Sequence, residues 1–371
     1  MAKNKTKKTA VRTVTWELRL VGALLAVTGL ALGAVLSLDL VRGWRLMFPA
    51  VEASGAVVGA PLSTSDARPV QYARRLDGVF MDSSAAADSA PVGIMIENSV
   101  ETRPQSGLAK ARVVYETLAE GGVTRFLAIF ALTDEVKKIG PVRSARHYYV
   151  DLIEEYGGAY AHAGGSPLGL SQISRDQVPD LNGIGNAWRY FYRDNNLPAP
   201  HNLFTNSVQL NRAVVDLRYP SSAEFDPWTY DDVRTPPTGS TPATSIAIDF
   251  SGRAYLANYE YEASSNTYLR SNGGRPHTDR DTGHQLRTDN VVVQVVPRPK
   301  LLAEKGRIDL EVIGRGQVLV FRNGTVVEGT WTKETPTGRT AFSGPDGQAI
   351  SLNRGTTWVA IVPADRPVTY R

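Results

Sequence analysis

The stretch Val113-Val-Tyr-Glu-Thr-Leu-Ala-Glu-Gly-Gly-Val-Thr-Arg-Phe-Leu-Ala-Ile-Phe-Ala-Leu132 decides the fold of the central part of this 371-residue chain. Two apolar runs rich in β-branched and aromatic residues flank a glycine pair. Such a pair supplies the positive φ angles that a tight hairpin turn needs. We therefore predict a β-hairpin in which Glu120 lies opposite Val123 and Leu118 lies opposite Arg125.

The charged residues of this hairpin are predicted to gather on one face. Because side chains alternate along a strand, the predicted register places Glu116, Glu120 and Arg125 on the same side. Cross-strand diagonals of about 7 Å remain within reach of long side chains, so Arg125 would contact both carboxylates. The other side, with Tyr115 and Phe126, is predicted to be core.

Short elements around the hairpin predict a mixed α/β segment. Residues 92–96 form the apolar run of a buried strand, and Glu97 follows at its end. Residues 159–163 predict another strand, which carries His162. The pair Ser166-Pro then has the pattern of a helix start, in which serine caps the first turn and proline begins it.

Two arginines crowd the start of the helix predicted over residues 144–156. Arg143 and Arg146 lie where the helix macrodipole already favours negative charge. Their positive charges are therefore unfavourable unless a bound anion or an acidic side chain neutralises them. A carboxylate or a phosphate would suit this position.

The sequence from residue 245 onward predicts mostly β-structure. Turn-forming residues are dense between 234 and 243, and Arg322-Asn-Gly-Thr325 is a strong hairpin signal. We therefore predict an α+β protein, with an N-terminal mixed α/β domain at 76–235, a linker at 236–244 and a mostly β C-terminal domain at 245–371. The predicted strands of the second domain are 245–250, 254–262, 267–270, 290–296, 308–313, 317–322, 325–332 and 358–362.

The N-terminal region predicts one transmembrane helix ahead of both domains. Residues 20–38 carry no charge, and at about 1.5 Å per residue such a helix nearly crosses the hydrocarbon core of about 30 Å. We predict a basic cytoplasmic tail at 1–19, a single-pass anchor in the lipid bilayer at 20–40 and a linker at 41–75. A cleaved secretory signal is the alternative, although this apolar run is longer than the usual signal region.

Charge and cysteine content exclude several classes of protein. The first 19 residues hold six Lys or Arg and one Glu, a charge of +5, so the rest of the chain sums to −1 of the total +4. This excess of basic residues before the apolar run predicts a cytoplasmic N-terminus and an extracytoplasmic bulk, and it gives no reason to expect nucleic-acid binding. The chain has no cysteine, which excludes a lipid-modified cysteine, disulfides and a cysteine nucleophile.

Ionisable residues of the α/β segment predict a polar binding site. Arginine pairs well with carboxylates and phosphates, so we expect an anionic or zwitterionic envelope component, such as a peptidoglycan fragment. A structural network of salt bridges is the alternative use of the same groups. The candidate ligand-binding residues are Glu97, Arg103, Glu116, Glu120, Arg125, Arg143, Arg146 and His162.

Two further classes of function stay open. Paired carboxylates at Glu116 and Glu120 would suit the acid–base chemistry of a cell-wall hydrolase, and the β domain would suit a protein-interaction scaffold. No catalytic residue is assigned, and no cofactor is expected. The segment from His277 to His284 contains four potential metal ligands, but its arginines and glycines favour a solvated loop over a metal site.

Long stretches of the sequence carry a resemblance that spans nearly all of residues 76–371. They include Pro91-Val-Gly-Ile-Met-Ile-Glu-Asn98, Glu120-Gly-Gly-Val-Thr-Arg-Phe126, Gly140-Pro-Val-Arg-Ser-Ala-Arg146 and Leu352-Asn-Arg-Gly-Thr-Thr-Trp358. These stretches resemble the YerB-like family of bacterial envelope proteins. The resemblance implies an N-terminal and a C-terminal domain, a place in the cell envelope and an undefined biochemical activity. Family members are typically lipoproteins, whereas this chain lacks the cysteine that a lipid anchor needs.

Overall fold

The computed structural model describes residues 70–222, 224–232, 240–303 and 305–371, which belong to one compact unit. The predicted tail and the anchor at 20–40 lie outside the described residues, as do most of the linker at 41–75 and residues 236–239. Among the helices that the structure describes, none is both long enough and apolar enough to cross a membrane.

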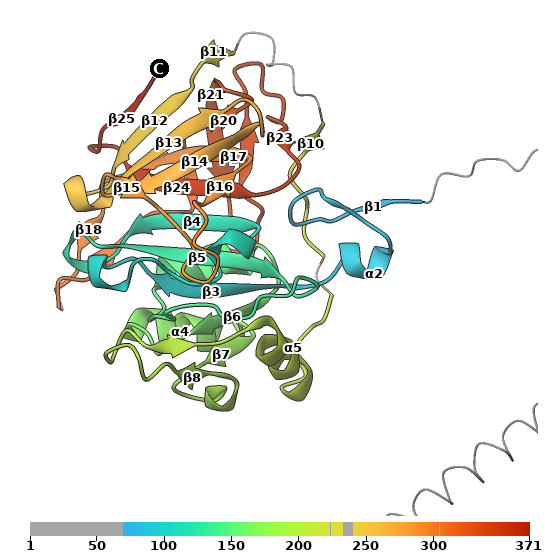
Figure 1. Cartoon of the computed structure of the whole chain (residues 1–371), viewed down its shortest axis with the longest axis vertical. Helices are drawn as coiled ribbons and strands as arrows, with labels where there is room; N and C mark the ends of the chain where they lie inside the picture. The colour runs from blue at the N-terminus through green and yellow to red at the C-terminus, as the bar shows by residue number, and fades with distance from the viewer. Residues whose placement is uncertain (1–69, 223, 233–239, 304) are drawn as a thin grey trace, which may run out of the picture. The chain divides into compact units, whose positions relative to one another are not determined.

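An 11-stranded sheet runs through this unit and contains strands from both predicted domains (Figure 1). The two predicted domains meet where Trp358 lies opposite Val114, in a parallel strand pair. In spatial order the strands are β11 (Thr241–Pro242), β21 (Thr325–Lys333), β20 (Gly314–Arg322), β17 (Asn290–Val296), β24 (Thr357–Pro363), β4 (Val113–Leu118), β5 (Thr124–Ala131), β3 (Pro91–Glu97), β6 (Ala159–His162) and β7 (Asp180–Asn182), with β22 (Ala341–Ser343) beside β21.

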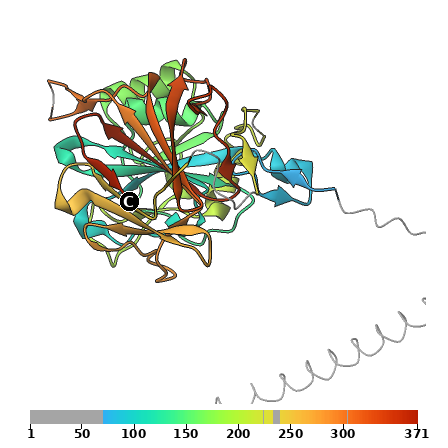
Figure 2. The same ribbon diagram turned by 90° about the horizontal axis from the view of Figure 1, so that it is seen from above.

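A second, six-stranded sheet is built entirely by the C-terminal segment (Figure 2). Its apolar residues Ile246 and Tyr259 belong to the same buried cluster as Phe126 and Trp358 of the large sheet, so the two sheets pack on each other. In spatial order its strands are β15 (Arg275–Pro276), β14 (Thr267–Asn272), β13 (Leu256–Glu262), β12 (Ser245–Asp249) and β25 (Val368–Tyr370), with β16 (Arg287–Thr288) beside β14.

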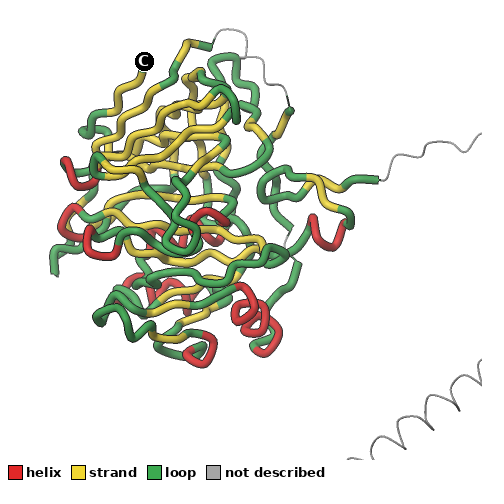
Figure 3. The backbone as a smooth tube through the Cα atoms, in the orientation of Figure 1, coloured by secondary structure: helices red, strands yellow, loops and turns green. Residues whose placement is uncertain are grey.

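Helices are short and few in the described residues (Figure 3). The α-helices are α2 (Ser84–Ala87), α3 (His147–Glu154), α4 (Pro167–Arg175) and α5 (Ser207–Asp216). The 3₁₀ turns are η1 (Val100–Thr102), η2 (Leu108–Lys110), η3 (Glu120–Gly122), η4 (Trp188–Tyr190) and η5 (Arg253–Tyr255). Four small strand pairs complete the unit: β1 (Tyr72–Ala73) with β2 (Phe80–Met81), β8 (Tyr192–Arg193) with β9 (Leu203–Phe204), β10 (Tyr230–Asp231) with β23 (Leu352–Asn353), and β18 (Lys300–Leu301) with β19 (Ile308–Asp309).

The central hairpin is buried on both faces. Tyr115 and Leu127 pack in one apolar cluster with Tyr149 of α3, whereas Phe126 packs in the other cluster, which includes Tyr259 of the second sheet. The predicted hairpin is therefore present, but the prediction that only one face forms core is wrong. Mixed sheets with few helices confirm the α+β class.

The hairpin register differs from the predicted one by one residue. Leu118 lies opposite Thr124, and Thr117 lies opposite Arg125. The reason is the turn, in which Glu120 joins the glycines in η3, with φ of +66° at Gly121 and +74° at Gly122. A one-residue slip moves a side chain to the other face of the sheet, so the turn decides which charged groups meet.

Helix α3 begins later than predicted, at His147, because the preceding residues bind neighbouring segments. The amide of Arg143 donates to Met95 O at 2.9 Å, and that of Ala145 donates to Gly164 O at 2.9 Å. These bonds keep the chain extended up to the helix. The predicted cap at the next helix is confirmed, since Ser166 Oγ accepts from the amide of Gly169 at 3.1 Å.

Candidate functional site

Glu120 holds two of the predicted arginines at the start of α3. Arg146 makes a bidentate ion pair with it, Nε to Oε1 at 2.5 Å and Nη2 to Oε2 at 2.8 Å. Arg125 Nη2 donates to Oε2 at 3.3 Å. Burial acts to raise the pKa of Glu120, but the hydrogen bond of Arg146 and the charges of both arginines outweigh it and lower that pKa. An acidic side chain therefore neutralises the helix start.

Glu97 neutralises the other arginine of this region. Its Oε1 lies 3.2 Å from Arg143 Nε, and its Oε2 lies 2.8 Å from His201 Nδ1. Glu97 is directly opposite Arg125 across β3 and β5, so the two side chains share a face of the sheet. We call Glu97, Glu120, Arg125, Arg143 and Arg146 the α3 cluster; it unites five of the eight predicted site residues, with each arginine paired to a carboxylate.

Glu116 lies on the opposite face of the hairpin, within the apolar cluster that contains Trp358. Its Oε2 accepts from Arg270 Nη2 at 2.7 Å, and its Oε1 accepts from Thr124 Oγ1 at 2.9 Å. Both side chains of the Glu116–Arg270 pair are 1% exposed. The prediction that Glu116 and Glu120 share a face is therefore wrong, because the turn shifts the register. The two carboxylates on which the hydrolase alternative depends therefore bind different partners, Arg270 for Glu116 and Arg146 for Glu120.

His162 binds Asp180 and local backbone rather than the charged side chains of the α3 cluster. Its Nε2 is 2.8 Å from Asp180 Oδ1, and its Nδ1 is 2.8 Å from Gly164 O. The side chain is fully buried, with 0% of its surface exposed. These contacts join β6 to the start of β7 and to the glycine turn, which is a structural role.

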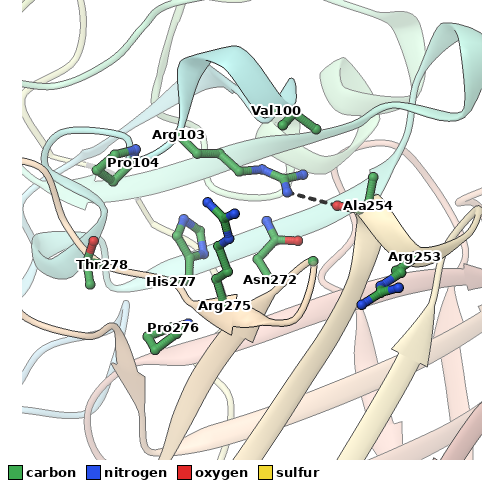
Figure 4. Close-up of a pocket in the computed structure, with 11 residues that line it drawn as sticks. Val100, Arg103, Pro104, Arg253, Ala254, Asn272, Arg275, Pro276, His277 and Thr278 are labelled. Carbon is green, nitrogen blue, oxygen red and sulfur yellow. Dashed lines mark hydrogen bonds between the residues drawn. The ribbon is translucent and has the colours of Figure 1, made fainter.

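Arg103 lines a pocket with a volume of about 570 Å³ between η1 and the β14–β15 hairpin (Figure 4). Three arginines, Arg103, Arg253 and Arg275, line this pocket together with no carboxylate. We call it the arginine pocket. The other lining residues are Val100, Pro104, Ala254, Asn272, Gly273, Pro276, His277 and Thr278.

The three arginines differ in how firmly they are held. Arg103 is fixed, since Nε donates to Asn98 Oδ1 at 2.9 Å, Nη2 to Asn98 O at 3.0 Å and Nη1 to Ala254 O at 2.8 Å. Arg253 and Arg275 are exposed and make no ion pair or side-chain hydrogen bond within the described part of the chain. Their charges are therefore available to a ligand.

A glycine turn shapes one wall of the arginine pocket. Gly273 and Gly274 have φ of +61° and +76°, as a two-residue hairpin turn requires. A Cβ atom on Gly273 would lie 3.2 Å from Arg103 Nη1 and 3.1 Å from Ala254 O. Glycine therefore permits the close approach of Arg103. The same turn places Asn272 directly opposite Arg275, on the same side of the strand pair.

A buried polar network lies behind this wall. Gln105 Oε1 accepts from His277 Nε2 at 2.7 Å, and His277 Nδ1 accepts from Arg270, which also pairs with Glu116. Burial lowers the pKa of His277 well below its usual value, and the charges of Arg270 and Arg103 act in the same direction. His277 is therefore neutral. Both ring nitrogens are occupied, and no group of three or more potential metal ligands occurs in the part of the chain that the structure describes.

Sequence reasoning found only Arg103 among the pocket residues on which the site depends. Arg253 begins a stretch of alternating polar and aromatic residues that indicates a strand with one polar face, but neither Arg253 nor Arg275 was predicted as a site residue, and His277 stood out only as a potential metal ligand. The glycine pair after Asn272 was the available signal, because it is the same hairpin signal that identified the central turn. It could have placed Asn272 beside Arg275.

Known proteins share this two-part architecture. Residues 76–220 match the N-terminal domain, and residues 246–359 the C-terminal domain, of a family described as "Protein of unknown function (DUF3048)". The chain is also 32% identical over 273 residues to "Putative lipoprotein YerB" of Bacillus subtilis (strain 168), covering 74% of this chain and 81% of that protein. This chain belongs to the YerB-like family. The crystal structure of the YerB protein from Bacillus subtilis matches with a TM-score of 0.70 at 29% identity, covering 80% of this chain and 98% of that one. The predicted YerB-like resemblance is confirmed.

Proposed function

We propose that this YerB-like protein binds an anionic or zwitterionic component of the cell envelope, such as a peptidoglycan fragment, in the arginine pocket. The observation that supports this function is the charge of the lining, three arginines with no carboxylate. Guanidinium groups form strong, directional hydrogen bonds with carboxylates and phosphates. We thus assign the ligand-binding role to Arg103, Arg253 and Arg275 rather than to the predicted residues of the α3 cluster.

The pocket combines one fixed arginine with two free ones. Arg103 already donates three hydrogen bonds to protein oxygens, so its position is set before a ligand arrives. Binding to a preorganised group loses less conformational entropy. Arg253 and Arg275, which belong to the C-terminal segment, then bind the anion with their free guanidinium groups. An apolar wall of Val100, Pro104 and Pro276 suits the carbon skeleton of a ligand larger than an inorganic ion.

We further propose that residues 20–40 hold the protein in the lipid bilayer, with the bulk of the chain outside the cytoplasm. The relative from Bacillus subtilis carries the name of a lipoprotein. This chain has no cysteine to accept a lipid, so a helix over its apolar run would take the place of a lipid anchor. Membrane fractionation followed by alkaline carbonate extraction tests this anchor, since an integral protein stays in the pellet.

Isothermal titration calorimetry with a soluble disaccharide-peptide from peptidoglycan tests the ligand class. The full-length chain in non-ionic detergent is compared with the double variant Arg253→Gln/Arg275→Gln. Hydrogen bonds to charged groups contribute about 1.5–3 kcal/mol each, so the variant should lose at least about tenfold in affinity. The N-terminal tail is identical in both proteins and cannot account for a difference.

The matched control is Arg189→Gln/Arg315→Gln, which removes the same charge from two exposed arginines that do not line the pocket. This control should bind within about twofold of the wild type, because only long-range charge is lost. Equal binding by wild type and pocket variant, or an equal loss in the control, would contradict the proposed function.

A further inference from the structure

Asn98 is fully buried and binds two of the residues that line the arginine pocket, Arg103 and Asn272. Its side-chain oxygen accepts hydrogen bonds from Arg103 Nε at 2.9 Å, Gln105 Nε2 at 3.1 Å and Asn272 Nδ2 at 3.0 Å. Its amide nitrogen donates to Thr124 Oγ1 at 2.7 Å and to Glu116 Oε1 at 3.3 Å. The orientation of this amide is therefore fixed by its partners, because an arginine can only donate and an ionised carboxylate can only accept.

The orientation of Asn272 follows from that of Asn98. The atom of Asn272 that faces Asn98 Oδ1 must be a donor, so it is Nδ2, and the other atom is the carbonyl oxygen. This Oδ1 is buried and has no hydrogen-bond partner within the described residues, although Asn272 lines the pocket. The whole residue is only 5% exposed. A buried carbonyl without a donor is unfavourable and is uncommon in folded proteins.

Arg275 is the cross-strand neighbour of Asn272. The two residues lie opposite each other on β14 and β15, so their side chains leave the same side of the strand pair (Figure 4). An anion bound to Arg275 therefore comes close to Asn272. Because Oδ1 is buried, a ligand reaches it only after a neighbouring side chain moves. Arg275 is exposed and makes no ion pair or side-chain hydrogen bond among the described residues, so its side chain is free to move.

We infer that Asn272 Oδ1 accepts a hydrogen bond from the ligand, which must therefore carry an N–H or O–H group next to its anionic group. This inference rests on the proposed function and narrows its ligand class. Anions that lack a neighbouring donor leave the carbonyl unpaired, so the pocket discriminates against them. Amide-linked carboxylates and hydroxylated phosphate esters both have the required chemistry.

Two pairs of small acids test the inference and separate its two ligand sources. N-acetylglycine and levulinate differ in an N–H replaced by CH₂, while glycerol 3-phosphate and n-propyl phosphate differ in their hydroxyl groups. Ligand-observed NMR titration of the full-length chain should show about tenfold tighter binding of the donor-bearing member of at least one pair, which corresponds to about 1.4 kcal/mol. The pair that shows this preference identifies the donor as an amide or a hydroxyl.

The variant Asn272→Leu removes the carbonyl and keeps a similar volume. It should bind both members of each pair with equal affinity, at the level of the weaker member in the wild type. The wild-type preference is measured without any variant, so it decides the matter even if Asn272→Leu does not fold.

Equal binding within both pairs by the wild type, lost in Arg253→Gln/Arg275→Gln, would overturn the inference and leave the proposed function intact. A preference that persists in Asn272→Leu would overturn it as well. Failure of all four acids to bind the wild type would overturn the proposed function and this inference together.

Discussion

The α3 cluster and the arginine pocket use the same side chain under opposite conditions. In the α3 cluster Arg125, Arg143 and Arg146 each lie within 3.3 Å of a carboxylate oxygen. In the pocket Arg253 and Arg275 have no carboxylate partner among the described residues, and no acidic residue joins them in the lining. Both regions contain three arginines, so the number of positive charges does not distinguish them.

Charge compensation, rather than the number of arginines, therefore separates a structural role from a binding role. A paired guanidinium has already exchanged its water for a protein partner, and removing that partner destabilises the fold. An unpaired, exposed guanidinium keeps its hydration and can exchange it for a ligand. Charge removal in the paired regions should therefore lower stability, and charge removal in the pocket should lower affinity.

The buried Glu116–Arg270 pair is the extreme case of compensation and should give the largest effect. Replacing Arg270 by Ala removes the ion-pair partner of the Glu116 carboxylate, which is 1% exposed. Breaking one side of a buried ion pair typically costs about 3–5 kcal/mol. Urea unfolding followed by tryptophan fluorescence measures the loss. A change below about 1 kcal/mol would mean that the pair does not hold the two segments together.

Glu120→Gln should have the next largest effect, about 2 kcal/mol, because it leaves Arg125 and Arg146 without their carboxylate. The fold lowers the pKa of Glu120 below its ordinary value near 4.5. Its contribution to stability is therefore present above that value and is lost as the pH falls through the lower, folded-state pKa. Thermal unfolding should separate variant and wild type at pH 7, and the gap should close in acid. Equal melting temperatures of Glu120→Gln and the wild type at pH 7 would mean that the ion pairs of Glu120 do not stabilise the fold.

The elements were predictable where periodicity and turn residues sufficed. Strands β3, β5 and β17 and the start of α4 follow from apolar runs and from the Ser166-Pro cap. The arrangement of the charged site residues was not predictable, because it depends on one residue in a turn and on contacts between distant segments. Because Glu120 is part of η3, the strand register is shifted, and Glu116 lies on the face opposite to Arg125. There it pairs with Arg270, which is 154 positions away in the sequence. The spacing of residues within one segment does not predict such pairings between distant segments.

Glu154 is an acidic side chain without an ion-pair partner among the described residues. Removing its charge should raise stability, by less than the loss expected for Glu120→Gln. Burial, together with the charges of Asp176 and Asp151, raises its pKa from 4.5 to about 7. The folded state thus binds its proton more firmly than the unfolded state. The associated stability is present below pH 4.5 and is lost as the pH rises to about 7. Glu154→Gln should therefore match the wild type at pH 4 and melt at a higher temperature at pH 8.

Differential scanning calorimetry at both pH values checks this expectation. Glu334→Gln, at an exposed position, is the matched control and should follow the wild type throughout. A variant of Glu154 that melts lower than the wild type at pH 8 would show that its charge is compensated after all.

The pocket arginines should have the smallest effect on stability. Arg253→Gln/Arg275→Gln removes two exposed charges without a protein partner, so the free energy of unfolding should stay within about 0.5 kcal/mol of the wild type. Thermal unfolding measures this directly. A loss as large as that of Glu120→Gln would erase the distinction between the two regions.

Anomalous diffraction from crystals of the protein soaked in selenate would show where uncompensated positive charge gathers, because arginine side chains without a carboxylate partner bind this dianion. The strongest selenium peak is predicted in the arginine pocket, within hydrogen-bonding distance of Arg275 and Arg103, with no comparable peak at the α3 cluster. The strongest peak at the α3 cluster, beside Arg143 or Arg146, would contradict the account and return the binding role to the helix start.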